Sequence, residues 1–510
     1  MRRAIRIGST IVFACSIGLS APNAGAAPSH AVTISSSTPS QMARARFERH
    51  LTQMRVRARP HVALPRPAAA RAAVSVATWA VRVGNTVQIG TDTLPGPEPP
   101  NAQSDTTIEP DIAMDPNDPD HLVATYQEGR FRNGASAGIG WAASPDGGRT
   151  WADGNMPNLT QAVGGSWERA SDPAVVWGPD HVVYIDSLVV SFKAGVTGIA
   201  VQRSTDGGRT WSDPVVVQSD PTGQAFNEKT FIAADTFASS PYFGRIYVAW
   251  DRADVGGAEP IVLRYSDDHG QTWSGLIQIP GSTGIGALPL VEPNGDLAMV
   301  WDDFGTGSDV EVSALSRDGG STWSPLSTID TFEGSGPPDM RTGGLPSAAV
   351  DPRSGTLYVV WQDARYRSDG TNDVVLSRSS NEGRSWRPLT IVNGDGPDSG
   401  IDHFTPAVAT WGPSVHVTYR TRAFADGAYS DLVGTGYVRS RDNGTTFGNE
   451  RQLGPVTDLR WAARAHGKYL GDYMAIAAYG DIAHPVWCAA SEPQHKKRWH
   501  QTTWSSTISG

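Results

Sequence analysis

Cysteine is nearly absent from the 510 residues of this chain, which holds only Cys15 and Cys488. Residues 1–26 have the three parts of a secretory signal peptide: a segment with three arginines, an apolar core, and Ala24-Gly25-Ala26 as a cleavage site. Loss of this segment would remove Cys15 and leave Cys488 alone, which excludes an intramolecular disulfide. We therefore expect a secreted protein, extracellular or periplasmic, whose fold is held together by its core.

Long apolar runs and charged residues are also scarce. Beyond residue 26 no run is long and apolar enough to span a membrane, so we expect no transmembrane segment. Charged residues make up 18% of the chain, and its net charge is −10. Residues 1–75 contribute +10, from eleven arginines and one acid, which leaves −20 for residues 76–510. Because residues 76–510 are this acidic, the sequence excludes a protein that binds nucleic acids in general.

Residues 27–75 are rich in Ala, Arg, Ser and Pro and lack a pattern that would build a core. This composition predicts a flexible leader, with a pro-segment or a cell-surface tether as the alternative. From residue 76 to residue 508 the chain consists of short apolar runs separated by turn signals. That pattern predicts one all-β domain.

An octet of the form Ser-x-Asp-x-Gly-x-Thr-Trp recurs along this domain. Its copies are Ser144–Trp151, Ser204–Trp211, Ser266–Trp273, Ser316–Trp323, Ser379–Trp386 and Ser440–Phe447. A spacing of mostly about sixty residues indicates one supersecondary unit built repeatedly. The Asp can accept hydrogen bonds from N–H groups of its own turn, and the Gly permits a backbone conformation that other residues resist. We expect the octets to be structural rather than catalytic.

These octets resemble the Asp-box, the bacterial neuraminidase repeat. Four copies match it closely, while Asn381 replaces the Asp of one copy and Phe447 replaces the Trp of another. The resemblance implies a sialidase-like β-propeller of four-stranded antiparallel blades. Asp-boxes also occur in other glycosidases, in polysaccharide lyases and in non-enzymatic propellers, so the resemblance alone leaves the function open among these classes.

The first strand of each repeating unit predicts the number of blades. These strands begin near Pro110, Asp172, Thr230, Ala287, Pro346, Thr405 and Gly471. We therefore predict seven blades with six Asp-box turns, and six blades as the alternative, because sialidases have six. The seventh unit has no box and lacks one strand, so we expect the run Ala80–Gly90 to supply that strand and close the ring.

Charged residues lie just before the first strands and just after the second strands, and we expect them to converge on one mouth, a usual place for the ligand of a propeller. The predicted catalytic residues are Asp251, Asp363, Tyr473 and Glu128, and the predicted substrate-binding residues are Arg130, Arg252, Arg365, Arg420, Arg422 and His403. In the Asp251–Arg252 and Asp363–Arg365 segments, a buried aromatic ends the second strand and the next residues turn into the mouth. The alternative is structural, because such carboxylates and arginines can form ion pairs between blades.

The resemblance implies a chemistry for these residues. A sialidase needs an arginine trio for the substrate carboxylate, an acid–base Asp, and a Tyr nucleophile polarised by Glu. Tyr419 and Tyr473 are candidates for the Tyr, and Glu128 and Glu228 for the Glu. The F/Y-R-I/L-P motif that carries the first arginine of sialidases is absent, so no residue is carried over at that position.

We therefore predict a glycan-active enzyme, most simply a sialidase-like exo-glycosidase acting on an acidic sugar. One alternative is a lyase acting on a uronate-containing glycan, with His403, His466 or Tyr473 removing the proton. Another is a non-catalytic propeller that binds glycans or proteins. No cofactor or metal is expected, because no ligand cluster, phosphate loop or zinc signature occurs. The expected partner is a glycan or polysaccharide, and the chain is expected to be a monomer.

Overall fold

The computed structural model describes residues 76–77, 81–96, 99–254, 256–305, 309–342, 344–425, 428–494 and 498–510. The predicted signal peptide and leader, residues 1–75, lie outside the described residues. Apart from three short 3₁₀ helices, η1 (Gln161–Val163), η2 (Pro179–His181) and η3 (Ala364–Tyr366), the regular structure that is described consists of strands. The all-β prediction is confirmed. Among the described helices, none has the length and apolar character needed to cross a membrane.

One twelve-stranded sheet contains strands from both ends of the described chain. Its order is β10-β9-β8-β7-β5-β4-β3-β33-β32-β31, with β2 beside β33 and β6 beside β5. The strands are β2 (Arg82–Gly90), β3 (Ala102–Asp115), β4 (Asp118–Phe131), β5 (Ser136–Ser144), β6 (Ala152–Asn155), β7 (Arg169–Trp177), β8 (Val183–Ser191), β9 (Val196–Ser204), β10 (Val215–Pro221), β31 (Ala475–Tyr479), β32 (Ile482–Ala490) and β33 (Gln501–Ser509). Only one residue pair joins β5 to β7, and only one joins β3 to β33, so the sheet divides into antiparallel groups of four.

The middle of the chain forms separate antiparallel sheets in chain order. Three have four strands: β11 (Ala225–Ala234), β12 (Ile246–Asp254), β13 (Ile261–Ser266) and β14 (Ile277–Gln278); β15 (Gly284–Val291), β16 (Leu297–Asp303), β17 (Val310–Ser316) and β18 (Ser327–Thr331); and β20 (Ser347–Val350), β21 (Leu357–Asp363), β22 (Asp373–Ser379) and β23 (Thr390–Ile391). A fourth has β24 (Ile401–Trp411), β25 (Ser414–Ala425), β27 (Leu432–Ser440) and β29 (Arg451–Asp458), with β26 (Ala428–Tyr429) beside β25. Two short parallel pairs complete the set: β1 (Val76–Ala77) with β28 (Phe447–Gly448), and β19 (Met340–Arg341) with β30 (Lys468–Tyr469).

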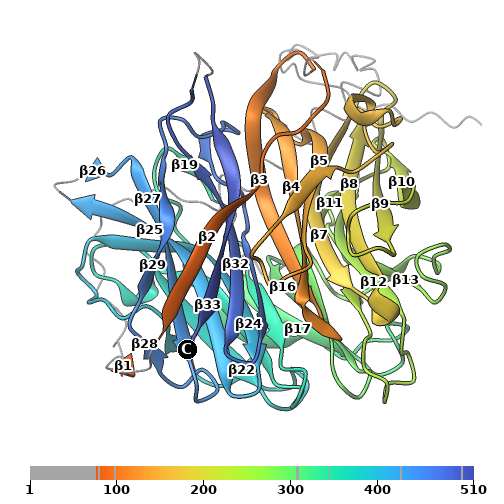
Figure 1. Ribbon diagram of the computed structural model, residues 1–510. Helices are drawn as coiled ribbons and strands as arrows, with labels where there is room; N and C mark the ends of the chain where they lie inside the picture. The colour runs from red at the N-terminus through yellow and green to blue at the C-terminus, as the bar shows by residue number, and fades with distance from the viewer. Residues whose placement is uncertain are drawn as a thin grey trace, which may run out of the picture. The chain divides into compact units, whose positions relative to one another are not determined.

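The two ends of the described chain meet in one group of strands. Strand β2 pairs antiparallel with β33, and Val83 lies opposite Ile508, as can be followed in Figure 1. This is the pairing expected for the N-terminal run. The first strands β3, β7, β11, β15, β20, β24 and β31 contact one another in this order, and β31 contacts β3 in turn.

Large aromatic side chains fill equivalent places in the core. Trp250, Trp301, Trp361 and Trp487 lie toward the end of the second strand of their groups and have no exposed surface. Burying an aromatic side chain contributes strongly to core stability. The expected buried aromatic of the second strand is therefore present, and it fixes the position of the residue that follows it.

The six octets share one hydrogen-bond pattern, which the second copy illustrates. Ser204 Oγ donates to Asp206 Oδ1 at 2.8 Å, and Gly208 N donates to Ser204 Oγ at 2.9 Å. Asp206 in turn accepts from the backbone N–H groups of Arg209 and Thr210 and from the Thr210 hydroxyl. Burial by itself would raise the pKa of the Asp206 carboxyl, but these hydrogen bonds lower it to about 2. Each octet begins at the last residue of a third strand.

Asp206→Ala is expected to lower the free energy of unfolding by about 1–3 kcal/mol, because the turn N–H groups lose their acceptor. The control Asp153→Ala removes a carboxylate that accepts a long hydrogen bond of 3.5 Å from the Thr91 hydroxyl, and should change stability by less than about 0.5 kcal/mol. Urea unfolding at neutral pH measures both variants. Unchanged stability of Asp206→Ala together with lost activity would show that the octet has a catalytic role instead.

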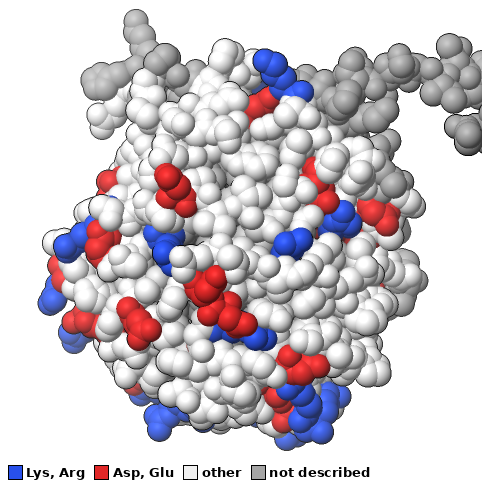
Figure 2. All heavy atoms as spheres, turned by 90° about the vertical axis from the view of Figure 1, so that its right-hand side faces the viewer, with Lys and Arg blue, Asp and Glu red and all other residues white. Residues whose placement is uncertain are grey.

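Charged side chains are mixed in sign on the face that Figure 2 shows, which is the right-hand side of Figure 1, where β9, β10, β12 and β13 lie. Acidic and basic residues are interspersed there, with some in contact, and most of the surface between these groups is uncharged. A field of one sign, of the kind that attracts a polyanion from a distance, is not present on this face.

Candidate functional site

Five of the first strands carry a β-bulge at the same place. The bulged residues have a left-handed backbone: Glu109 in β3 (φ 52°), Asp172 in β7 (φ 47°), Lys229 in β11 (φ 46°), Gly286 in β15 (φ 72°) and Thr405 in β24 (φ 50°). This conformation is uncommon for residues other than glycine. A bulge re-aims a side chain out of the strand's alternation, and bulges are frequent next to functional sites.

Three of the bulged residues meet through the ammonium group of Lys229. Its Nζ lies 3.1 Å from Glu109 Oε1, 3.2 Å from Asp172 Oδ1 and 2.9 Å from Asp472 Oδ2. All four side chains are buried, with exposed fractions of 2% or less. Burial by itself would lower the pKa of the Lys229 ammonium, but the three carboxylates raise it well above its ordinary value. The lysine is therefore charged in the interior.

Arg341 and Tyr469 complete this group of buried residues. Arg341 Nε donates to Asp472 Oδ1 at 3.1 Å, and a second guanidinium nitrogen pairs with the other oxygen of Asp472. Tyr469 Oη donates to Glu109 Oε1 at 2.5 Å. The guanidinium carbons of Arg130 and Arg341 lie 5.0 and 4.7 Å from the centre of the Tyr469 ring. We call Glu109, Asp172, Lys229, Arg341, Tyr469 and Asp472 the Lys229 cluster.

The pKa values in the cluster follow from burial and ion pairing. Burial alone would raise the pKa of the Asp472 carboxyl, but Arg341 and Lys229 lower it far below its usual range. Burial raises the pKa of the Glu109 carboxyl, and Lys229 offsets only part of that rise. Burial also raises the pKa of the Tyr469 phenol well above 10.0. Tyr469 is therefore a neutral donor at physiological pH, and Glu109 is its acceptor.

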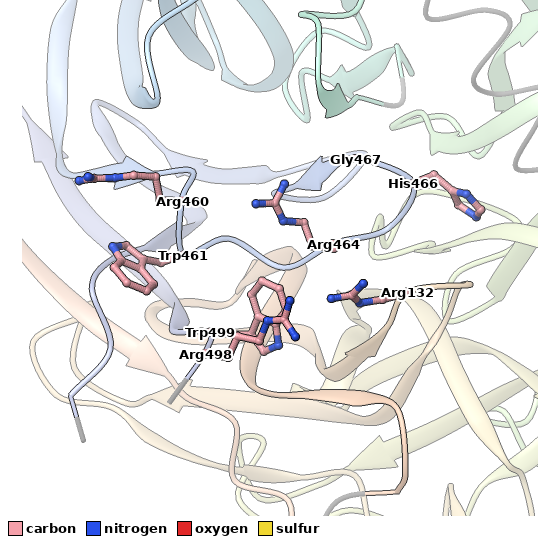
Figure 3. Close-up of a pocket in the computed structure, with 8 residues that line it drawn as sticks. All are labelled: Arg132, Arg460, Trp461, Arg464, His466, Gly467, Arg498 and Trp499. Carbon is pink, nitrogen blue, oxygen red and sulfur yellow. The ribbon is translucent and has the colours of Figure 1, made fainter. Parts of the chain in front are cut away.

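A cavity of about 640 Å³ borders the same part of the chain (Figure 3). Its lining is basic and aromatic, and consists of Arg132, Arg460, Trp461, Arg464, His466, Gly467, Arg498 and Trp499. Arg132 follows β4, residues 460–467 connect β29 to β30, and Arg498 and Trp499 precede β33. Figure 3 shows Arg460 and Trp461 at one end, while the His466 imidazole points away from the other labelled side chains. We call this the arginine cavity.

Backbone contacts tie the arginine cavity to the Lys229 cluster. Gln103 accepts a hydrogen bond from Arg464 N and donates to both Arg464 O and Arg130 O. Two residues beyond Gly467, Tyr469 N donates to Ala463 O at 2.9 Å. The segment that forms the cavity wall therefore also positions the phenol that hydrogen-bonds to Glu109.

Three of the four arginines of the cavity have no carboxylate partner among the residues that the structure describes. Arg460 pairs with Asp458 through two nitrogens. Arg132 and Arg498 lie against Trp499, with guanidinium carbons 5.6 and 4.8 Å from the ring centre. Within the described ranges, no carboxylate oxygen lies within 4.0 Å of a guanidinium nitrogen of Arg132, Arg464 or Arg498. The cavity can therefore bind an anion without breaking an ion pair at these three residues.

The predicted catalytic residue Asp251 lies among other acids. It is fully buried, and its Oδ1 accepts from Gly286 N at 3.4 Å. Burial, followed by the neighbouring carboxylates of Glu259 and Glu228, raises its pKa well above the ordinary value. In the described part of the chain, its neighbours are Gly286 of the bulged strand β15 and the acids Glu259 and Glu228, and none of them is a member of the Lys229 cluster.

The other predicted catalytic carboxylates also have local partners. Asp363 accepts from the Nε and Nη2 atoms of Arg365 and caps η3 through Arg365 N. Glu128 accepts from Thr93 N at 3.2 Å and from Asn155 Nδ2 at 2.5 Å. Burial raises the pKa of Glu128 well above its usual value, and nearby Asp92 adds to the rise.

Tyr473 is the one predicted catalytic residue that contacts the Lys229 cluster. The Lys229 ammonium lies 5.5 Å from the centre of its ring. Its hydroxyl, however, donates to the backbone oxygen of Pro173 at 2.9 Å and not to a carboxylate. The catalytic roles assigned to Tyr473, Asp251, Asp363 and Glu128 stay predictions.

The predicted substrate-binding arginines have partners within the protein. Arg130 Nη1 donates to Gln127 Oε1 at 2.6 Å, beside the Lys229 cluster. Arg252 pairs with Asp220 at 2.7 Å, Arg365 with Asp363 at 2.6 Å, and Arg422 with Asp339 at 3.3 Å; Arg420 donates to the backbone oxygen of Cys488 at 2.7 Å. Such contacts match the structural alternative, in which these residues join groups of strands.

His403 lies in a separate ionic group. Its Nε2 is 3.4 Å from Asp395 Oδ1, and the ligand atoms of Asp373, Asp395 and His403 all lie within 4.8 Å of one another. Arg367 Nη1 pairs with Asp373 at 3.2 Å and with Asp395 at 3.0 Å. The guanidinium therefore already supplies the positive charge that a metal ion would bring to these carboxylates.

Comparison with known proteins finds one matching family model and two curated relatives. Residues 120–365 match the model of the BNR repeat-like domain. The chain is 25% identical over 272 residues to a sialidase of Micromonospora viridifaciens, covering 49% of this chain and 40% of that protein. It is 28% identical over 268 residues to a xyloglucanase of a Paenibacillus species, covering 49% of this chain and 23% of that protein. It thus spans less than half the length of either.

Solved structures give weaker matches. One is a protein of unknown function from Dyadobacter fermentans, with a TM-score of 0.46, 16% identity, and coverage of 71% of this chain and 99% of that one. Another is the intramolecular trans-sialidase of Ruminococcus gnavus, with a TM-score of 0.43, 13% identity, and coverage of 62% and 90%. The Asp-box turns and the match of residues 120–365 to the repeat model support a relationship of this chain to the BNR or Asp-box superfamily of sialidase-like propellers.

Proposed function

We propose that the protein is a secreted glycoside hydrolase that acts on an acidic sugar, with the arginine cavity as its substrate-binding site. The observation that carries this proposal is the lining of the cavity, where three unneutralised arginines lie with two tryptophans. Arginine binds carboxylates through paired hydrogen bonds, and an indole offers a flat apolar surface to a sugar ring. The sialidase and the xyloglucanase among its relatives support a glycan as substrate.

Tyr469 and Glu109 are the pair that we assign to the chemistry. The phenol oxygen would attack the anomeric carbon while its proton moves to Glu109 and the bond to the leaving oxygen breaks; the leaving oxygen takes a proton from water. A second water molecule then attacks the anomeric carbon, gives its hydroxyl to the sugar and its proton to the Tyr469 oxygen. Glu109 returns its proton to the hydroxide left by the first water, so one water is consumed overall. Tyr469 has no exposed surface, so residues 463–469 must move when the glycan binds.

The same proposal includes a closed propeller of seven blades. It is supported by the pairing of β2 with β33 and by the cyclic contacts of the seven first strands. A crystal structure with six blades, or with β2 outside the ring, would contradict it. We also propose that the protein is a monomer, which light scattering on the purified protein tests directly.

Arg464→Gln is expected to lower kcat/KM on an acidic glycan by about tenfold or more, because a charge-assisted hydrogen bond to the substrate is lost. Folding should be retained, since the guanidinium makes no ion pair among the described residues. The matched control is Arg149→Gln, which changes an exposed arginine of the first octet. Rates are measured by the release of reducing ends, and melting temperatures confirm folding.

The products distinguish the possible functions. New reducing ends without new absorbance indicate a hydrolase, whereas a double bond conjugated with a carboxylate absorbs in the ultraviolet and indicates a lyase. The absence of any product across acidic and neutral glycans would contradict the proposed hydrolase and favour a binding propeller.

A further inference from the structure

We propose that Lys229 is the positioning residue of the Tyr469–Glu109 pair: its ammonium group fixes the Glu109 carboxylate in place and keeps it in the charged form that accepts the proton of Tyr469. This inference rests on the proposed function for the chemistry of the pair, and it adds what controls the pair. In this scheme Lys229 acts through Glu109 and forms no bond to the sugar.

One carboxylate oxygen of Glu109 receives both the phenol and the ammonium group. Glu109 Oε1 accepts a hydrogen bond from Tyr469 Oη at 2.5 Å and from Lys229 Nζ at 3.1 Å. The backbone N–H of Asp472 donates to the same oxygen at 3.1 Å. The oxygen that lies ready to take the Tyr469 proton is therefore the one that Lys229 holds, so the ammonium group sets the position of the acceptor.

The ammonium group is itself fixed in space. An ammonium group has three N–H donors. Lys229 Nζ has three carboxylate acceptors, Glu109 at 3.1 Å, Asp172 at 3.2 Å and Asp472 at 2.9 Å. They come from β3, from β7 and from the connection between β30 and β31, and the lysine side chain is only 1% exposed. A flexible side chain held from three sides loses its freedom, so its contact with Glu109 is maintained.

Backbone geometry brings the lysine and the glutamate together. Lys229 in β11 and Glu109 in β3 both lie in β-bulges, with φ values of 46° and 52°. Strand β7 contacts both β3 and β11, and a side chain as long as lysine reaches past it. A left-handed backbone costs about 1–3 kcal/mol in residues other than glycine. The fold maintains this conformation at both ends of the contact, as a fixed donor and a fixed acceptor require.

Several other charged or titratable groups face Glu109. Arg341 binds Asp472 through two nitrogens. Arg130 acts through Gln127, which accepts from Arg130 Nη1 at 2.6 Å and donates to Glu109 Oε2. Lys229, by contrast, contacts Glu109 directly. The groups around Glu109 are Lys229 from β11, Asp172 from β7, Arg130 from β4, Arg341 from β19, Tyr469 from β30, Asp472 and Tyr473 from the connection that follows β30, and Cys488 from β32.

Lys229 and Asp172 influence the charge of Glu109 in opposite directions. Burial raises the pKa of the Glu109 carboxyl, the Lys229 ammonium opposes this rise, and the Asp172 carboxylate adds to it. Without the ammonium group, Glu109 would bind a proton at a higher pH, and a protonated carboxyl does not accept the proton of Tyr469. Without the charge of Asp172, Glu109 would stay ionised to a lower pH. Substitutions at the two positions therefore predict opposite shifts.

The pH dependence of kcat tests the inference on the full-length protein, with the glycan that the wild type cleaves fastest. The acid limb of the profile reports the ionised acceptor. We expect Lys229→Met to move this limb to higher pH by about one unit or more, and Asp172→Asn to move it to lower pH by about half a unit or more. The control Lys468→Met removes a lysine whose carboxylate partners are about half exposed, and should leave the limb in place.

Infrared spectroscopy measures the charge of Glu109 without a substrate. The difference between each protein and its Glu109→Gln counterpart isolates the carbonyl band of the protonated Glu109 carboxyl. As the pH is lowered, this band should appear at a higher pH in Lys229→Met than in the wild type, and at a lower pH in Asp172→Asn. Circular dichroism shows that each variant is folded.

A purely structural lysine would lower stability without moving either profile. Unshifted protonation of Glu109 in both variants, or shifts in the same direction, would overturn the inference. If Lys229→Met does not fold, Asp172→Asn decides alone, and an acid limb that stays in place or rises would overturn it.

The outcomes also separate this inference from the proposed hydrolase. Opposite shifts of the infrared band in a protein that cleaves no glycan would support the control of Glu109 by Lys229 and contradict the hydrolase. Cleavage with an acid limb that neither variant moves would support the hydrolase and overturn the inference.

Discussion

Lys229→Met is expected to lower the free energy of unfolding by about 3–5 kcal/mol, the usual range for removing one partner of a buried ion pair. The variant leaves the carboxylates of Glu109 and Asp172 buried without their ammonium partner, while Asp472 keeps Arg341. Methionine fills a similar volume, so the loss reports the charge rather than a cavity. Urea unfolding at neutral pH gives the difference between the two proteins.

The difference should depend on pH in a defined direction. The pKa of the Lys229 ammonium is raised above its ordinary value of 10.5, so its stabilising contribution is complete below pH 10.5 and is lost as the pH rises further. The pKa of the Asp472 carboxyl is lowered below 3.8, so its contribution is complete above pH 3.8 and is lost as the pH falls. We therefore expect the two proteins to differ most between about pH 5 and about pH 9.

The matched control is Lys468→Met. Lys468 also pairs with two carboxylates, Asp339 at 2.8 Å and Asp431 at 2.5 Å, but both partners are about half exposed. Exposed pairs contribute about 0–1 kcal/mol, so this variant should be close to the wild type. Equal losses in Lys229→Met and Lys468→Met would contradict the assignment of a buried ionic cluster.

Structural features that depend on residues close together in the sequence could be predicted. Each octet closes its own turn through contacts within eight residues, such as Ser204 with Asp206 and Asp206 with Thr210, so its geometry needs no distant partner. The extra strand β2 was predictable as well, because the last unit lacked a strand and the N-terminal run alternated as a strand does.

Ion pairs between distant segments could not be predicted. Lys229 and Asp472 are 243 residues apart, and contacts between strands that are distant in sequence bring them together. For the Asp251–Arg252 segment, the sequence prediction assumed that two adjacent residues point into the same mouth. Successive residues of a strand point to opposite faces, so Asp251 faces Gly286 whereas Arg252 pairs with Asp220.

The arginine cavity left only a weak signal in the sequence. Its arginines and tryptophans lie in irregular connections, Arg460–Gly467 and the approach to β33, where no periodicity tells which side chains converge. Three of the five bulges had a signal in the sequence, because proline follows Glu109, Asp172 and Thr405. Thr230 follows Lys229, so the central residue of the cluster carried no such signal.

Tyr469→Phe is expected to lower kcat by about 10³-fold or more, because the variant has no oxygen to attack the sugar. Folding should persist at a cost of about 1 kcal/mol, since Glu109 loses one hydrogen bond and keeps its contacts with Lys229 and the Asp472 backbone N–H. Initial rates on the best substrate of the glycan panel, with urea unfolding in parallel, measure both effects.

Tyr473→Phe is the matched variant for this experiment. It removes a buried hydroxyl from a ring whose centre lies 5.5 Å from the same lysine. That hydroxyl donates to Pro173 O, and within the described residues no carboxylate accepts its proton. We expect a similar loss of stability and a fall in kcat of less than about tenfold. If Tyr473→Phe abolishes turnover while Tyr469→Phe retains it, the nucleophile is Tyr473, as the sequence predicted, and Glu109 serves only to hold the Lys229 cluster together.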